Sequence, residues 1–217
     1  MAATLTYIHD PLCGWCYAAA PLVAAIAGDP VPGLDLVLIH RALFTGANAM
    51  PNTPDFARYA WSNDQRIAHL TGQPFSAAYR DGVLGDRNQA IDSWHTALAK
   101  QAVDRMAPGR APEFLGLMQH ARFVAGADLT DRAVLAGLGA GMGLEAGTLA
   151  AMIEAPATAE AAAAERELAA GLLAKAGHNG VPLLLLDEGQ GPQAIDHGRF
   201  LGQPAAFRGA LAERFAA

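Results

Sequence analysis

The chain has 217 residues, 52% of them hydrophobic, so it can bury a sizeable core and is not a disordered segment. Its net charge of -6 and the lack of a Lys/Arg cluster exclude a protein that binds the nucleic-acid backbone. The apolar stretches are too short to span a membrane, and the first residues lack the basic and apolar regions of a secretory signal. We therefore expect a cytoplasmic protein with neither membrane nor nucleic acid as partner.

The first part of the chain predicts a strand–helix–strand unit. Residues 4–9 alternate and are rich in β-formers, which predicts a strand. The Ala-rich segment 14–27 predicts a helix, and Pro21 either kinks this helix or divides it in two. Residues 34–39 predict a second strand. Strands joined through a helix lie parallel, with a right-handed crossover.

The central block, residues 45–176, is helical in character and contains no strand-like run. Ser93 is placed to cap one helix, and Pro112 suits the first turn of another. Short connections between these helices predict an all-α unit. The predicted helices span 53–70, 74–80, 92–106, 111–125, 131–140, 145–154 and 157–175.

The last part of the chain returns to strand patterns. Leu183–Leu186 is a short apolar run bounded by turn residues, which predicts a buried strand. Residues 193–196 follow a Gly-rich turn and predict the second strand of a hairpin. Residues 204–215 predict a final helix with its apolar side chains on one face.

The order of these elements predicts the domain organisation. A β-α-β unit precedes the helical block, and a β-β-α unit follows it. Residues 1–44 and 177–217 together are enough for one small α/β domain. We therefore predict that residues 45–176 form a large all-α insertion in that domain.

The chemistry that the sequence indicates depends on Cys13 and Cys16, the two cysteines of the chain. A C-x-x-C motif suits either a redox pair or half of a zinc site. Zinc would need two further ligands, and no pair of histidines follows at the spacing of a zinc finger. A C-x-x-C that heads a helix directly after a strand, inside a β-α-β unit, favours the redox pair.

The two cysteines are predicted to have different roles. Cys13 would lie at the helix N-terminus, where free N–H groups and the helix dipole stabilise a thiolate. Cys16 would lie one turn later and point inward. Cys13 would therefore attack a substrate disulfide, and Cys16 would resolve the mixed disulfide.

Several segments resemble DsbA-like proteins of the thioredoxin superfamily, and among these the cytoplasmic FrnE-like members with a helical insertion. Asp10–Tyr17, which reads D-P-L-C-G-W-C-Y, is similar to their active-site signature. Pro21 matches the proline inside the first helix of thioredoxins, and Gly180–Pro182 resembles their cis-proline loop. Ile195–Gly202 is similar to the last strand and turn of the family.

This resemblance implies a thioredoxin fold and a thiol–disulfide oxidoreductase or isomerase. It implies no cofactor beyond the redox-active disulfide, with disulfide-containing proteins or peptides as substrates and glutathione as a candidate co-substrate. If Pro182 is cis, as in the family, the loop would face Cys13, and the backbone of Val181 would bind an extended substrate. Without the resemblance, a trans proline at the start of a strand would be the ordinary expectation.

Other residues near the proposed site have competing interpretations. Trp15 could contact substrate or pack against the insertion. His9 and His178 could polarise Cys13 or shuttle a proton, although a structural hydrogen bond is the commoner role of such histidines. The aromatic side chains of the insertion could line a groove, but their helical spacing is more typical of a core. They are Phe56, Tyr59, Trp61 and Trp94.

Two alternative functions belong to other classes. One is a glutathione-dependent isomerase or transferase, similar to 2-hydroxychromene-2-carboxylate isomerase or the kappa-class glutathione transferases. In those proteins a serine typically replaces the first cysteine, whereas this chain has Cys13 there. The other is a non-catalytic module that binds peptides or is stabilised by zinc.

Overall fold

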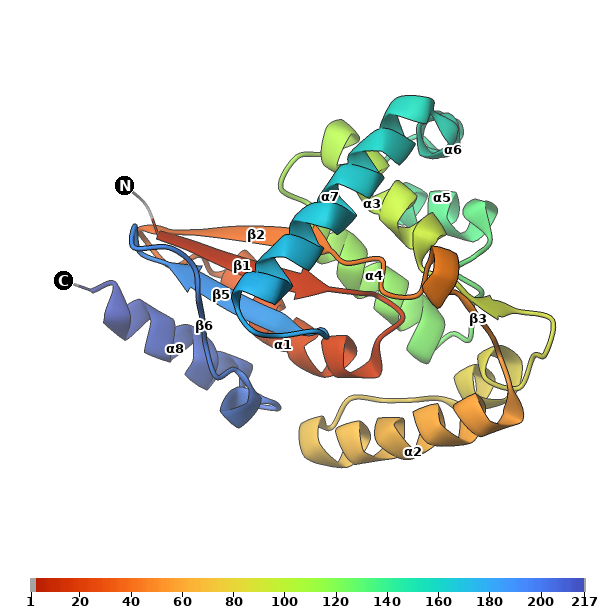
Figure 1. Cartoon of the computed structure of the whole chain (residues 1–217), viewed down its shortest axis with the longest axis horizontal. Helices are drawn as coiled ribbons and strands as arrows, with labels where there is room; N and C mark the ends of the chain where they lie inside the picture. The colour runs from red at the N-terminus through yellow and green to blue at the C-terminus, as the bar shows by residue number, and fades with distance from the viewer. Residues whose placement is uncertain (1–2, 217) are drawn as a thin grey trace.

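The computed structural model describes residues 3–216, which form a four-stranded mixed sheet with helices on both faces (Figure 1). The strand order is β2-β1-β5-β6, in which β1 is parallel to β2 and antiparallel to β5, and β5 is antiparallel to β6. This arrangement confirms the predicted parallel pair, the predicted hairpin and the thioredoxin fold. The strands of the sheet are β1 (Ala3–His9), β2 (Leu34–His40), β5 (Leu183–Asp187) and β6 (Gln193–Ala194).

The observed helices begin and end within two residues of the predicted ones, with one exception. Segment 74–80, predicted as a helix, instead leads into a π-helical turn at Tyr79–Val83. Helix α1 continues through Pro21, so this proline does not divide it. The helices are α1 (Gly14–Gly28), α2 (Pro54–Thr71), α3 (Trp94–Met106), α4 (Ala111–Phe123), α5 (Arg132–Gly141), α6 (Ala146–Glu154), α7 (Pro156–Lys175) and α8 (Pro204–Arg214).

The central block is helical except for one short strand pairing that the sequence did not predict. Strand β3 (Met50–Pro51) pairs antiparallel with β4 (Ala90–Ile91). Strands of two residues have no hydrophobic period, so tertiary contacts determine them. The buried amide of Asn52, directly after β3, donates to the carbonyl oxygens of Val83 (2.7 Å) and Asp86 (2.8 Å) and so holds the two segments together.

The N-terminus of α3 is capped by a different residue from the predicted Ser93. Ser93 occupies the N-cap position, but its hydroxyl accepts a hydrogen bond from the N–H of Phe44 at 3.0 Å and does not cap the helix. Asp92 accepts a hydrogen bond from the N–H of Trp94 at 2.8 Å in its place. Ser93 therefore links α3 to the segment that follows β2.

The central strands bury apolar side chains on both faces, because successive side chains of a strand point to opposite sides. Leu184 and Leu186 pack in one core with α1 and α8, whereas Leu183 and Leu185 pack in another with α7. The run Leu183–Leu186 is thus buried throughout, as predicted. Figure 1 shows α7 crossing one face of the sheet and α8 lying on the opposite side.

Helix α7 also contributes to a further core, built with α3, α4, α5 and α6. It lies within the predicted insertion and yet covers a face of the sheet, because Ala169 and Leu173 pack against the strands. The proposed boundary at residue 177 between an α/β domain and an inserted unit stays a prediction. Within residues 3–216, no helix combines the length and apolar composition needed to cross a bilayer.

Candidate active site

The two cysteines lie at the start of α1, with different exposure. Cys13 is the N-cap residue, has extended backbone angles and is half-buried. Cys16, one turn later, is fully buried, and its Sγ accepts a hydrogen bond from the N–H of Asp10 at 3.4 Å. Both thiols are free. A substrate can therefore reach the sulfur of Cys13, whereas the interior shields the sulfur of Cys16.

The same geometry separates the acidities of the two thiols. The pKa of Cys13 is lowered, first by the side-chain hydrogen bond from Cys16 and further by the backbone N–H groups of Cys16 and Trp15. Burial and the charge of Asp10 oppose this shift. The pKa of Cys16 is raised well above its ordinary value, mainly by burial and then by the neighbouring Cys13. Cys13 is therefore the thiol that ionises first.

The Val181-Pro182 loop lies against Cys13 although 168 residues separate them. The Val181-Pro182 peptide bond is cis, and the Cys13 thiol donates a weak hydrogen bond to the carbonyl oxygen of Val181, with a sulfur–oxygen distance of 3.7 Å. Strand pairing explains this proximity: Ile8 of β1 is opposite Leu183 of β5, so the residues after β1 meet those before β5. The loop thus lies where the sequence resemblance predicts.

Asp10 fixes the backbone between β1 and α1. Its carboxylate is buried and accepts hydrogen bonds from the N–H groups of Leu12 (2.9 Å) and Leu43 (2.7 Å). Its own N–H donates to Cys16. The sequence showed Asp10 only as part of the active-site signature, so this positioning role was not predicted.

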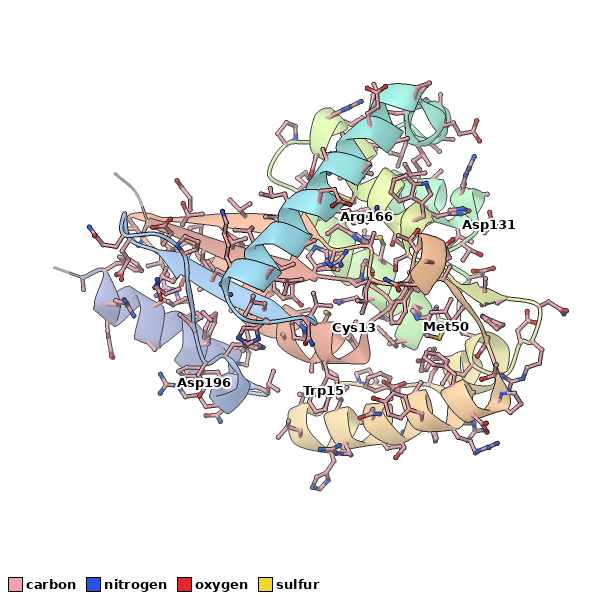
Figure 2. The ribbon with its side chains drawn as sticks, viewed as in Figure 1. Cys13, Trp15, Met50, Asp131, Arg166 and Asp196 are labelled. Carbon is pink, nitrogen blue, oxygen red and sulfur yellow. The ribbon has the colours of Figure 1, made fainter. Side chains whose placement is uncertain are left out.

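A cavity of about 360 Å³ opens beside Cys13, between α1 and α2. Trp15 lines it and is half-buried, with the guanidinium of Arg66 on α2 lying 5.8 Å from its ring centroid. Trp15 therefore both faces the cavity and packs against the helical block. Figure 2 shows Trp15 extending from α1 toward α2, with Cys13 and Met50 nearby.

The aromatic residues of the block have divided roles. Phe56 and Tyr59 both line the cavity. Phe56 also packs against a buried core cluster, as expected, whereas Tyr59 is 67% exposed, so the expectation of a core position was wrong for Tyr59. Trp94 packs against the core of α3 to α7, as expected. Trp61 packs against the aromatic cluster of Tyr17, Tyr79 and Phe123. A helical spacing indicates one face of a helix, but it does not reveal whether that face meets a core or a cavity.

Polar side chains that the sequence did not indicate line another part of this cavity. Asp64 of α2 accepts a hydrogen bond from the hydroxyl of Tyr79 at 2.9 Å. Arg122 of α4 lies over the ring of Tyr79, 5.6 Å from its centroid. A Cβ at Gly14 would lie 2.4 Å from Oδ1 of Asp64, so glycine permits this close approach. These residues come from separate segments, and no motif relates them.

The pKa of Asp64 is raised to about 6, first by burial, with Tyr79 and Arg122 opposing the shift. The folded protein therefore binds this proton more tightly than the unfolded chain does. It follows that the stabilising contribution is complete below about pH 4 and is lost as the pH rises through about 6.

Asp64→Asn should abolish this pH dependence. We expect the unfolding free energy of the variant, relative to wild type, to increase by up to about 3 kcal/mol between about pH 4 and about pH 7.5. Urea denaturation at the two pH values measures this difference. Asp55→Asn on the surface of the same helix is the matched control, with an expected change below about 0.5 kcal/mol. If the difference in unfolding free energy between Asp64→Asn and wild type stays constant with pH, the raised pKa of Asp64 is contradicted.

Neither histidine proposed as a proton shuttle bonds to a cysteine among residues 3–216. His9 is buried, and its ring stacks on Tyr7 with centroids 5.1 Å apart, while neither ring nitrogen has a hydrogen-bond partner in the described part of the chain. Burial lowers the pKa of His9 well below its usual value, and the charges of His40 and Lys100 lower it further. His178 is exposed. The predicted structural hydrogen bond of His9 is therefore not made.

A zinc centre would need further ligands around the two cysteines. Among residues 3–216, no three or more His, Cys, Asp or Glu side chains are grouped so that they could hold a metal ion. The Sγ of Cys16 accepts a hydrogen bond from the N–H of Asp10, and the thiol of Cys13 donates to the carbonyl oxygen of Val181.

Comparisons with known proteins give a consistent result. Residues 4–202 match the family model of the DSBA-like thioredoxin domain. The structure of the cytosolic disulfide reductase DsbM from Pseudomonas aeruginosa has 35% sequence identity and a TM-score of 0.88, over 98% of each chain. A structure of that reductase with GSH has 34% identity and a TM-score of 0.87, over 99% of this chain and 100% of the other.

A more distant likeness concerns the alternative function. A structure of 2-hydroxychromene-2-carboxylate isomerase has 17% identity and a TM-score of 0.63, over 98% of each chain, which shows a shared fold alone. None of the curated proteins matches the chain in sequence.

Proposed function

Since the chain belongs to the family of DSBA-like thioredoxin domains, we propose that it is a disulfide reductase in which Cys13 is the nucleophile and Cys16 the resolving thiol. The observation that carries this proposal is the asymmetry of the pair. Cys13 is accessible and has a lowered pKa, whereas Cys16 is buried and has a raised one.

In the first step, the thiolate of Cys13 attacks one sulfur of a substrate disulfide. The substrate S–S bond breaks, one substrate thiolate leaves and takes up a proton, and a mixed disulfide forms at Cys13. The carbonyl of Val181 lies beside the sulfur of Cys13 and offers a backbone acceptor to an extended peptide substrate. Trp15 presents an apolar surface to the substrate from within the cavity.

In the second step, Cys16 attacks Sγ of Cys13. The negative charge of Cys13 is one cause of the raised pKa of Cys16, and the mixed disulfide removes this charge. Cys16 therefore ionises more readily once substrate is attached. Its attack releases the second substrate thiolate and leaves the Cys13–Cys16 disulfide, so two electrons and two protons have passed from the pair to the substrate.

The substrate class follows from the site and from the relatives. We propose disulfide-containing peptides or small molecules, with glutathione as a co-substrate that restores the dithiol. A reductase at 34–35% identity is described as cytosolic and has been determined with GSH, which supports both this substrate class and a cytoplasmic location. Isomerisation of protein disulfides would use Cys13 alone: a second thiolate of the substrate attacks the mixed disulfide, forms a new substrate disulfide and restores the thiolate of Cys13.

The decisive experiment is reduction of insulin by the protein with glutathione as electron donor. We expect wild type to accelerate the reaction and Cys13→Ser to show only the uncatalysed rate, since a serine hydroxyl does not form a thiolate. Circular dichroism spectra of the two proteins should coincide, which shows that the variant is folded like wild type. Turnover by Cys13→Ser at the wild-type rate would refute the proposal.

The direction of electron flow needs a separate measurement, the equilibrium of the Cys13–Cys16 couple with glutathione. A reductase requires a potential near that of thioredoxin, about -270 mV. A potential near that of DsbA, about -120 mV, would mean that the reduced pair holds its electrons too tightly to reduce substrates. That outcome would indicate an oxidase.

A further inference from the structure

Arg122, near the end of α4, is a buried cation that forms no ion pair with the described residues. It is 4% exposed, and its Nε has no hydrogen-bond partner among residues 3–216. No ion pair found in that part of the chain includes it. The carboxylate of Asp64 accepts a hydrogen bond from the hydroxyl of Tyr79. The guanidinium carbon of Arg122 lies 5.6 Å from the ring centroid of Tyr79 and 5.8 Å from that of Phe123.

A guanidinium in this position is costly, because burial removes water from a charge that no ion pair among residues 3–216 balances. Asp64 in the same cavity attracts this charge without forming an ion pair and so balances it only in part. Contacts with two aromatic rings compensate only partly. Arg122 lines the same cavity as Cys13, so an anionic group that enters beside the reactive sulfur can reach it. The planar fork of a guanidinium matches a carboxylate through two parallel hydrogen bonds.

We propose that Arg122 binds a carboxylate of a small acidic disulfide substrate, of the glutathione class, while the disulfide lies at Cys13. This inference rests on the proposed function and specifies its substrate class. The volume of about 360 Å³ falls within the range of small-molecule sites, about 300–1,000 Å³. Most of the lining is apolar and includes Trp15 and Phe56, while the carboxylate of Asp64 accepts a hydrogen bond from the hydroxyl of Tyr79. Arg122 is thus a specificity residue that the redox step itself does not require.

Single-turnover oxidation of the pre-reduced protein by two disulfides tests this role. Glutathione disulfide carries carboxylates, whereas 2-hydroxyethyl disulfide undergoes the same exchange and carries none. In Arg122→Met we expect the half-saturating concentration of glutathione disulfide to rise about 10- to 100-fold, as for loss of a charge-assisted hydrogen bond. The maximal rate with glutathione disulfide, and the rate with hydroxyethyl disulfide, should each change less than about 3-fold.

Two further variants complete the test. Arg122→Lys retains the charge without the planar fork and should recover part of the affinity for glutathione disulfide. Arg105→Met removes an arginine that contacts Ala157 and Thr158 outside the cavity, and it should match wild type with both disulfides. Equal losses with the two disulfides in Arg122→Met would show a structural role and overturn the proposal. Unchanged kinetics with both would overturn it as well.

A measurement on the wild-type protein covers the case in which Arg122→Met does not fold. S-methylglutathione should bind at least about 10-fold more tightly than its diethyl ester, which lacks the free carboxylates. Equal binding of acid and ester would refute the role of Arg122. If wild type reacts with neither disulfide, the proposed function itself fails, and this result is distinct from a loss of preference between substrates.

Discussion

Replacing Cys16 with serine should convert the protein into a trap that holds its substrate at Cys13. Reduced wild type should release two substrate thiols for each disulfide and end as the Cys13–Cys16 disulfide. Cys16→Ser should release one thiol and keep the other half of the substrate covalently bound. The reason is that Cys16 attacks from within the same helix turn, and this intramolecular attack is much faster than attack by a free thiol.

Mass spectrometry of acid-quenched samples measures this difference. With glutathione disulfide, we expect a roughly stoichiometric glutathione adduct in Cys16→Ser and roughly two orders of magnitude less in wild type at the same time point. Cys13→Ser is the matched control and should form no adduct, because Cys16 is buried and its pKa is raised. An adduct in Cys13→Ser would mean that Cys16 is the nucleophile. Release of both substrate thiols by Cys16→Ser would mean that Cys16 is not the resolving thiol.

The second large effect is expected at Lys100, which links α3 to α7. Its ammonium is buried and pairs with Asp104 at 2.8 Å and with Glu165 of α7. Lys100→Met would leave the largely buried carboxylate of Glu165 without its cation. Because an uncompensated buried charge is costly, we expect the unfolding free energy to fall by about 3–5 kcal/mol.

Chemical denaturation of three variants tests this expectation. Lys100→Met combined with Glu165→Gln should recover part of the loss, because the stranded charge is removed. Arg58→Met breaks an exposed pair with Asp55 and should cost less than about 1 kcal/mol. If Lys100→Met unfolds at the same denaturant concentration as wild type, the buried pair does not hold α7 against α3.

This pair also bears on the site through the position of α7. Helix α7 packs on the sheet through Ala169 and Leu173, beside the strands that end at the active-site loops. Where β2 ends, Nδ1 of His40 accepts from the N–H of Ala42, so its Nε2 donates to the hydroxyl of Thr96 on α3 at 2.9 Å. The helical block is thus joined to the sheet by buried polar contacts at the same end as Cys13.

Local patterns in the sequence determined the framework of the site. Alternation in 4–9 and the strand-like run 34–39 predicted the parallel strands, and the apolar run Leu183–Leu186 predicted the strand that is buried on both faces. The C-x-x-C motif directly after the first strand placed Cys13 at a helix N-terminus and Cys16 inside, as observed. These features depend on backbone periodicity and on helix ends, which a short segment contains in itself.

The composition of the cavity was decided only by the tertiary structure. Asp64, Tyr79 and Arg122 belong to segments far apart in the chain, and helix packing brings them together. The antiparallel pairing of β1 with β5 likewise brings Val181 to Cys13, a proximity that the sequence indicated only through family resemblance. No local period encodes such contacts, because they depend on how buried surfaces of distant elements fit. The sequence by itself therefore determined where Cys13 and Cys16 lie, whereas the packing of α2 and α4 against α1 decided what surrounds them.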